Sequence, residues 1–227
     1  MCIRDSLESE PADKLIPTPE DDLPAFDRVD LSGPGDATFV EVAWRAPKAD
    51  SEDFFAFTIL ESLLTGPSSL NMFGGGGISN RTSRLYLALV EKELAVSVGG
   101  NLNANVDPGS FTINLTKHPA RSVRRLLSAL DAQIEIIQSE PITQAEIDRA
   151  VKQAKALFAY GSDNITNQAF WMGYANSFAD YSWFSEYVER LAAVSPEQVR
   201  NTAGKYLRPD ARVIGVYTPN GTGGTND

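Results

Sequence analysis

Residues 94–117 read LAVSVGGNLNANVDPGSFTINLTK, and this stretch predicts a β-hairpin. Leu94–Asn105 and Ser110–Lys117 have the residue types of strands, and Asp107-Pro108-Gly109 between them is typical of a tight turn. Proline fixes its own φ at a value suited to a turn, while aspartate and glycine tolerate the conformations around it. We therefore expect the two segments to pair as neighbouring antiparallel strands.

Two further strands are predicted near the ends of the chain. Thr38–Arg45 alternates apolar and polar residues, and Ala211–Tyr217 is a short run rich in apolar residues. Most of the sequence between the strands has helical periodicity instead. Strands that bracket a block of helices are typical of an α+β two-layer sandwich. We expect a mostly antiparallel sheet that helices cover on one side.

Capping residues and apolar periodicity locate the predicted helices. Ser51 is expected to cap the first helix and Gly66 to end it, and Thr143 with Glu146 forms a capping box at the start of a later helix. The predicted helices cover residues 51–66 and 82–93, start near Pro119 and at Thr143, cover 164–193 as a pair or one broken helix, and start again at Ser195.

The two ends of the chain differ in composition from the middle. Residues 1–36 are rich in Pro, Asp, Glu and Ser and have little apolar periodicity, which is typical of a disordered leader or linker. Residues 220–227 are expected to form a flexible tail, which leaves one domain at 37–219. Met1–Ser6 lacks the features of a signal peptide, and we expect the natural polypeptide to begin further upstream.

The charge balance limits the classes of partner. The chain has 30 acidic and 20 basic residues, for a formal net charge of -10. Such a surface repels phosphate backbones and anionic headgroups, so nucleic acid and membrane surfaces are poor partners. We expect no membrane insertion, because no apolar run approaches the roughly 20 residues that a span requires.

The sequence lacks the side chains for a hydrolytic metal site. Its only histidine is His118 and its only cysteine is Cys2. A zinc hydrolase needs three protein ligands, commonly from H-E-x-x-H or H-x-x-E-H. We therefore expect no metal and no catalytic residue in this chain. His118 is also the only ordinary base for a nucleophilic triad, and we interpret it as a turn residue at the start of a helix.

Two other features have more than one interpretation. The glycine run from Gly74 to Gly77 either connects two helices as a flexible surface loop or presents its backbone to an extended peptide. It lacks the lysine of a phosphate-binding loop. The aromatic residues between Phe170 and Tyr187 belong either to the core or to a ligand pocket, and their helical spacing favours the core.

An ordered set of motifs resembles a known family. The glycine run precedes SRLYLALVEKELAVSV at residues 83–98, an F-x-x-x-x-I-L-E-S-L-L-x-G helix starts earlier at Phe54, and S-P-E-Q-V-x-x-x-A-x-K-Y-L starts at Ser195. From about Thr38 to Pro219, this order resembles the second, zinc-free domain of the pitrilysin/insulinase metallopeptidases. That family includes the subunits of the mitochondrial processing peptidase.

The resemblance implies a repeated α+β domain. Two homologous halves form a module, and two modules face each other as a clam shell around a peptide. Zinc belongs to the first half, so we expect the cofactor in a missing or partner domain and not in this chain, which alone is expected to be inactive. The implied partners are a zinc-bearing N-terminal domain or subunit and a peptide substrate. The alternatives are a stand-alone inactive subunit and a structural assembly domain of the same fold.

The resemblance also implies candidate substrate contacts. Leu89 and Val96 stand where some family members carry a substrate-orienting Arg and Tyr, and neither side chain donates a hydrogen bond. Arg84 is a candidate substitute, the alternative being an ordinary surface arginine at a helix start. The compartment stays open, and a periplasmic or exported location in bacteria is compatible with the resemblance. The glycines that match the substrate-handling loop of the mitochondrial enzyme are Gly74, Gly75, Gly76 and Gly77.

Overall fold

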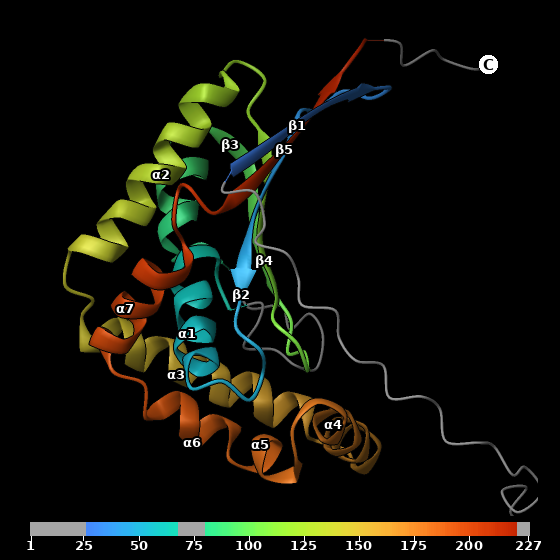
Figure 1. The fold of residues 1–227 in the computed structure, drawn as a ribbon, viewed down its shortest axis with the longest axis vertical. Helices are drawn as coiled ribbons and strands as arrows, with labels where there is room; N and C mark the ends of the chain where they lie inside the picture. The colour runs from blue at the N-terminus through green and yellow to red at the C-terminus, as the bar shows by residue number, and fades with distance from the viewer. Residues whose placement is uncertain (1–25, 68–79, 222–227) are drawn as a thin grey trace, which may run out of the picture.

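The computed structural model describes residues 26–67 and 80–221, which build a five-stranded sheet in the order β1-β5-β2-β4-β3 (Figure 1). β1 runs parallel to β5, and the other neighbouring strands are antiparallel. The hairpin predicted from residues 94–117 is confirmed as β3 and β4. The strands are β1 (Phe26–Gly33), β2 (Phe39–Ala46), β3 (Ala95–Leu102), β4 (Gly109–Lys117) and β5 (Arg212–Pro219).

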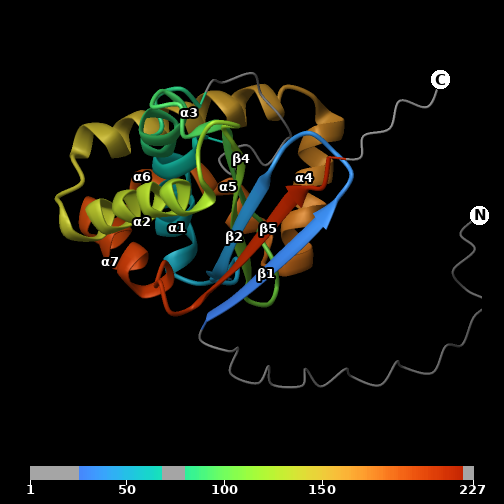
Figure 2. The same ribbon diagram turned by 90° about the horizontal axis from the view of Figure 1, so that it is seen from above.

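A layer of helices covers one face of the sheet. Figure 2 shows α1, α2, α3 and α7 on the same side of the strands, which confirms the predicted α+β sandwich. The helices are α1 (Asp53–Thr65), the π-helix η2 (Tyr86–Val90), α2 (Val123–Ser139), α3 (Gln144–Gly161), α4 (Ile165–Phe178), α5 (Tyr181–Ser185), α6 (Tyr187–Ala192) and α7 (Pro196–Tyr206). Within residues 26–67 and 80–221, no helix is both long and apolar enough to span a bilayer.

The alternation of side chains along β2 separates the two faces of the sheet. Val40, Val42 and Trp44 are buried under the helices, whereas Phe39 and Glu41 are exposed on the opposite side. This is the period of two that a pleated strand imposes. In the neighbouring strands the buried residues of the helix-covered face are Phe111, Ile113, Leu115, Ile214 and Val216.

α1 lies in the middle of the core. All its residues except Asp53 are buried, because it contacts β3 as well as α3, α6 and α7. A helix that is buried on all sides needs apolar residues all around, which explains its near-continuous apolar sequence. The predicted cap is shifted by one residue. Glu52 occupies the N-cap position, and the Ser51 hydroxyl accepts a hydrogen bond from the Asp53 amide at 3.2 Å.

β1 corrects the predicted domain boundary. Residues 26–33 lie within the segment 1–36 that we expected to be a leader or linker, yet they form an edge strand along β5. The acidic, proline-rich composition of that segment hides the strand, whose apolar residues Val29 and Leu31 are few. Its partner strand also lies at the other end of the chain, where no local pattern connects the two. Residues 1–25 and 222–227 lie outside the described part of the chain.

Candidate interaction face

Within the described residues, the sheet face opposite α1 carries exposed apolar side chains. Val29, Leu31, Phe39 and Val213 are exposed on it, and Leu31 and Phe39 keep 60% and 51% of their surface accessible. These residues lie on the neighbouring strands β1, β5 and β2. Adjoining exposed apolar side chains are typical of an interaction surface.

A hollow of about 610 Å³ lies on this face, lined by residues of all five strands. Leu31, Phe39 and Tyr217 form an apolar side of the hollow, and Asn114 and Thr116 contribute to a polar side on β4. Glu41 on the central strand lies between the two sides. Among the described residues that line the hollow, it is the only charged one.

The apolar wall of the hollow is held by the connection between β1 and β2. The Tyr217 hydroxyl donates a hydrogen bond to the Pro34 carbonyl oxygen at 2.7 Å, and the Tyr217 ring centroid lies 6.4 Å from that of Phe39. A Cβ atom at Gly33 would come within 2.5 Å of the same hydroxyl. Tyr217 is therefore fixed before any partner arrives, which reduces the entropy that binding costs.

The predicted substrate glycines Gly74, Gly75, Gly76 and Gly77 lie outside the described residues. The described residues on either side of that segment meet each other. A Cβ atom at Gly66 would lie 2.5 Å from the Cβ of Asn80, and the Asn80 side-chain amide donates to the Val98 carbonyl oxygen at 3.0 Å. Both ends of the glycine-containing segment are thus attached to the core beside β3.

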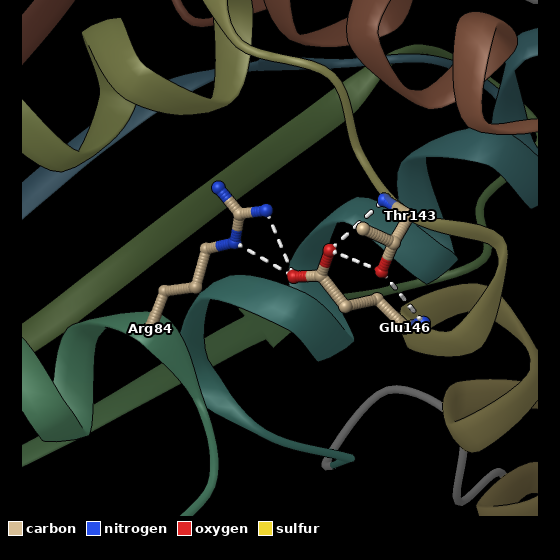
Figure 3. A network of polar contacts seen from close by, with 3 residues as sticks. All are labelled: Arg84, Thr143 and Glu146. Carbon is tan, nitrogen blue, oxygen red and sulfur yellow. Dashed lines mark hydrogen bonds and ion pairs between the residues drawn. The ribbon is translucent and has the colours of Figure 1, made fainter.

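Arg84, the other predicted site residue, contacts the start of α3 (Figure 3). Its Nε and Nη2 atoms donate to Glu146 Oε1 at 3.2 and 2.8 Å. Glu146 Oε2 accepts from the Thr143 amide at 3.0 Å and from the Thr143 hydroxyl at 2.9 Å, and this completes the predicted capping box. Arg84 therefore joins the segment before η2 to α3, and its role in peptide binding stays a prediction.

The charge state of Glu146 follows from these contacts. Partial burial pushes the pKa of Glu146 upward, but the hydrogen bonds from the Thr143 amide, from Arg84 and from the Thr143 hydroxyl more than offset burial. Its pKa consequently lies below the ordinary value of 4.5. The carboxylate is ionised near neutral pH, so the pair with Arg84 is intact there.

We expect Arg84→Ala to lower the free energy of unfolding by about 1–2 kcal/mol at pH 7, because a partly buried charged hydrogen bond is lost. A depressed pKa contributes stability above the unfolded-state value, and that stability is lost as pH falls through the folded-state value. The difference between wild type and variant should therefore be full above pH 4.5 and shrink below it. Urea denaturation at several pH values measures it.

The control for this prediction is Arg28→Ala. The Arg28–Asp30 pair has side chains that are 44% and 59% exposed, so its loss should leave the free energy of unfolding almost unchanged. Equal losses in both variants, or a loss that does not depend on pH, would contradict the structural role of Arg84.

The polar residues in the described part of the chain do not gather as a metal site. Within residues 26–67 and 80–221, no three His, Cys, Asp or Glu side chains cluster in that way. Thr58, Glu61 and Ser62 on α1 have the spacing of H-x-x-E-H, but hydroxyls stand where zinc would require imidazoles. His118 Nδ1 accepts a hydrogen bond from the Ala120 amide at 3.3 Å, which confirms its predicted place in the turn before α2.

The aromatic cluster divides between its two interpretations. Trp183 and Tyr187 belong to the core, where burial, followed by the charge of Glu61, raises the pKa of Tyr187. Phe170 and Tyr174 on α4 are exposed, because the only side chains that α4 buries are Ala175 and Phe178. The predicted core role is therefore right for Trp183, Phe184, Tyr187 and Phe178, and it is wrong for Phe170 and Tyr174.

The sequence matches the profile of the peptidase M16 inactive domain over residues 4–154. The chain belongs to this family. The match confirms the resemblance to the zinc-free domain of the pitrilysin/insulinase metallopeptidases and makes the chain an M16 inactive domain. No curated protein matches the chain.

Solved structures share the fold of this M16 inactive domain. A protease from Helicobacter pylori superimposes with a TM-score of 0.77 at 20% identity, over 91% of this chain and 48% of its own. An inactive peptidase domain from Bordetella parapertussis has a TM-score of 0.70 at 24% identity, and the match covers 83% of this chain and 94% of that one. The peptidase M16 inactive domain from Pseudomonas fluorescens has a TM-score of 0.65 at 24% identity, and the match covers 85% of this chain and 43% of that one. The chain thus spans about half the length of the Helicobacter protease.

Proposed function

We propose that this M16 inactive domain is the non-catalytic half of a zinc metalloendopeptidase. It pairs with a zinc-bearing homologous domain or subunit, lines the chamber that holds the peptide, and leaves hydrolysis to that partner. The observation that carries the proposal is the sheet face on which Leu31 and Phe39 are exposed beside a hollow of about 610 Å³. Adjoining exposed apolar side chains beside a hollow form a surface suited to contact with another domain.

The substrate contacts belong to the same proposal. Gly74, Gly75, Gly76 and Gly77 are proposed to contact peptide through main-chain amides and carbonyls, since glycine allows close backbone approach. The attachment of Gly66 and Asn80 to the core supports a fixed position for the ends of that segment. Arg84 is proposed as a weaker contributor, because two of its guanidinium nitrogens already donate to Glu146.

We expect the purified chain to contain well under one zinc ion per molecule and to show no peptidase activity that a chelator removes. The described residues provide no cluster of metal ligands, and binding a hydrolytic zinc needs three. Metal analysis measures the zinc content, and a fluorogenic peptide assay measures peptidase activity, each with and without 1,10-phenanthroline. Tight zinc at one ion per chain would overturn the proposal.

Co-expression with a zinc-bearing M16 domain from the same organism tests the pairing. The proposal expects a stable complex whose peptidase activity exceeds that of the zinc-bearing domain alone. A zinc-bearing domain that is equally active alone and does not bind this chain would contradict it. A stable complex without any gain in activity would favour a structural assembly role instead.

A further inference from the structure

α4 lacks the outward-facing charges of an ordinary surface helix. Its 14 residues include no charged side chain, and Ile165, Phe170 and Tyr174 are 82%, 60% and 39% exposed. Within residues 26–67 and 80–221 it packs mainly against α5, and the side chains that it buries are Ala175 and Phe178. A surface helix normally buries its apolar residues and exposes charged or polar ones. The exposed residues of α4 are therefore typical of a surface that another segment covers.

Three aromatic rings lie together on α4, and we call Phe170, Trp171 and Tyr174 the aromatic ridge. The rings of Phe170 and Tyr174 stack one helical turn apart, with an interplanar angle of 3° and a centroid distance of 6.2 Å. The Trp171 ring meets both edge-on, at 5.0 and 5.6 Å. Beside the ridge, a Cβ atom at Gly173 would meet no described atom within 4 Å. The rings hold one another in place, which lowers the entropy that binding to them costs.

The distance from α4 to the start of β1 follows from the strand register. The Tyr174 hydroxyl lies 3.5 Å from the Ala104 carbonyl oxygen, and Ala104 follows the end of β3 by two residues. One row of paired residues crosses the sheet from β1 to β3, namely Phe26, Arg212, Trp44, Phe111 and Leu102. Strands about 4.8 Å apart make this row about 19 Å long, and two extended residues add at most about 7 Å. The Tyr174 hydroxyl therefore lies within about 30 Å of Phe26.

The chain before β1 contains an uncharged, proline-rich stretch. Residues 15–19, which lie outside the described residues, read Leu-Ile-Pro-Thr-Pro. Proline fixes its own φ, and the residue before a proline is restricted to extended conformations, so this sequence favours a polyproline II helix. At about 3.1 Å per residue, the stretch begins about 22 Å from Phe26 and ends about 34 Å from it. That reach includes the distance from Phe26 to Tyr174.

Proline-rich chains and aromatic surfaces are complementary. A polyproline II helix has no internal hydrogen bonds and is already extended, so it loses little entropy when its prolines dock on aromatic rings. Alternate residues in this helix are about 6.2 Å apart. That spacing matches the 6.2 Å between the Phe170 and Tyr174 centroids. Pro17 and Pro19 can therefore pack on one ring each, and neither α4 nor residues 15–19 has a charge that loses its hydration.

We propose that residues 15–19 dock on the aromatic ridge of α4 as a polyproline II helix, with Pro17 and Pro19 on the rings of Phe170 and Tyr174. Because the stretch is tethered to β1, its effective concentration at α4 is about 1 mM. A second copy of the chain has no such advantage, and a net charge of -10 on each copy opposes association. The docking covers the apolar surface of α4 and fixes the path by which the chain enters β1. It does not depend on the pairing with a zinc-bearing domain.

Limited trypsin digestion of the full chain tests the docking, because the peptide bond after Lys14 adjoins the docked residues. Cleavage follows the fraction of molecules in which the segment is released. With an effective concentration of about 1 mM and a dissociation constant of about 0.1 mM, roughly one molecule in ten is released. The ridge variant Phe170→Ala/Tyr174→Ala should therefore raise the cleavage rate at Lys14 about tenfold. Mass spectrometry measures this rate, and each value is divided by the rate for a synthetic peptide with the same residues 8–24.

Two further variants separate docking from a general effect on the fold. Pro17→Ala/Pro19→Ala should raise the rate as much as the ridge variant does, whereas Phe39→Ala, which removes an exposed ring at the other end of the sheet, should leave it unchanged. Thermal unfolding midpoints show whether each variant is folded. A folded ridge variant that is cleaved no faster than wild type would overturn the inference. Protection that disappears on dilution from about 100 µM to about 1 µM would show that a second copy covers α4, and would also overturn it.

A disulfide cross-link locates the docked segment. In a Cys2→Ser background, Thr18→Cys is combined either with Gly173→Cys beside the ridge or with Ser128→Cys, an exposed position on α2. A disulfide requires the two Cα atoms to come within about 7 Å, so oxidised glutathione should cross-link the Gly173→Cys pair at least about tenfold faster. Non-reducing electrophoresis and mass spectrometry follow the intramolecular product. Equal rates for the two pairs would contradict docking on α4.

Discussion

Replacing Trp183 by alanine is expected to lower the free energy of unfolding by about 3–5 kcal/mol, the usual cost of deleting a large buried ring. Trp183 is 2% exposed and packs against Phe178, Phe55 and Tyr187, with ring centroids 4.9, 5.6 and 5.2 Å away. Its indole nitrogen also donates to the Ala49 carbonyl oxygen at 2.8 Å. The ring therefore connects α4, α1 and α6 with the loop after β2.

Urea denaturation measures this loss, and two variants serve as controls. Trp183→Phe keeps most of the ring but removes the donor to Ala49, so it should cost about 1–2 kcal/mol. Tyr160→Ala removes an aromatic side chain that is 78% exposed and should change stability by about 0.5 kcal/mol or less. A Trp183→Ala variant as stable as Tyr160→Ala would show that the helices pack differently.

Gly66→Ala is expected to destabilise the protein by about 3 kcal/mol. Gly66 ends α1 with φ 106° and ψ 178°, a backbone conformation that residues with a Cβ essentially do not adopt. The added methyl group would also lie 2.5 Å from Asn80 Cβ and 3.0 Å from Asn80 Cα, and backbone atoms give way poorly. Either the end of α1 or the position of Asn80 has to shift.

The matched control is Gly204→Ala in the exposed face of α7. A Cβ there meets no described atom within 4 Å, and alanine is the better helix former, so this variant should gain about 0.5–1 kcal/mol. Thermal and urea unfolding compare the two variants. Similar changes in unfolding free energy for Gly66→Ala and Gly204→Ala would contradict the close contact between Gly66 and Asn80.

Local chemistry made much of the fold predictable. The hairpin follows from a turn whose residues are adjacent, and the capping box of Thr143 and Glu146 lies within four residues. β1 could not be predicted in the same way, because its strand character depends on pairing with β5 at the other end of the chain. Composition alone assigned it to the linker.

The candidate sites also divide into features that the sequence predicts and features that only the structure shows. The prediction of no zinc site follows from counting one histidine and one cysteine, which needs no geometry. The partner of Arg84 is 62 residues away, so its contact with Glu146 is invisible in the sequence around it.

The pairing of β1 with β5 has a consequence for anyone who shortens this chain. A version that starts at Thr38, where the acidic and proline-rich stretch ends, would remove the outermost strand of the sheet and leave the full length of β5 as a bare hydrogen-bonding edge. Such an edge is a template for intermolecular β-pairing, and Val213 beside it is already exposed. β1 therefore also protects the protein against aggregation.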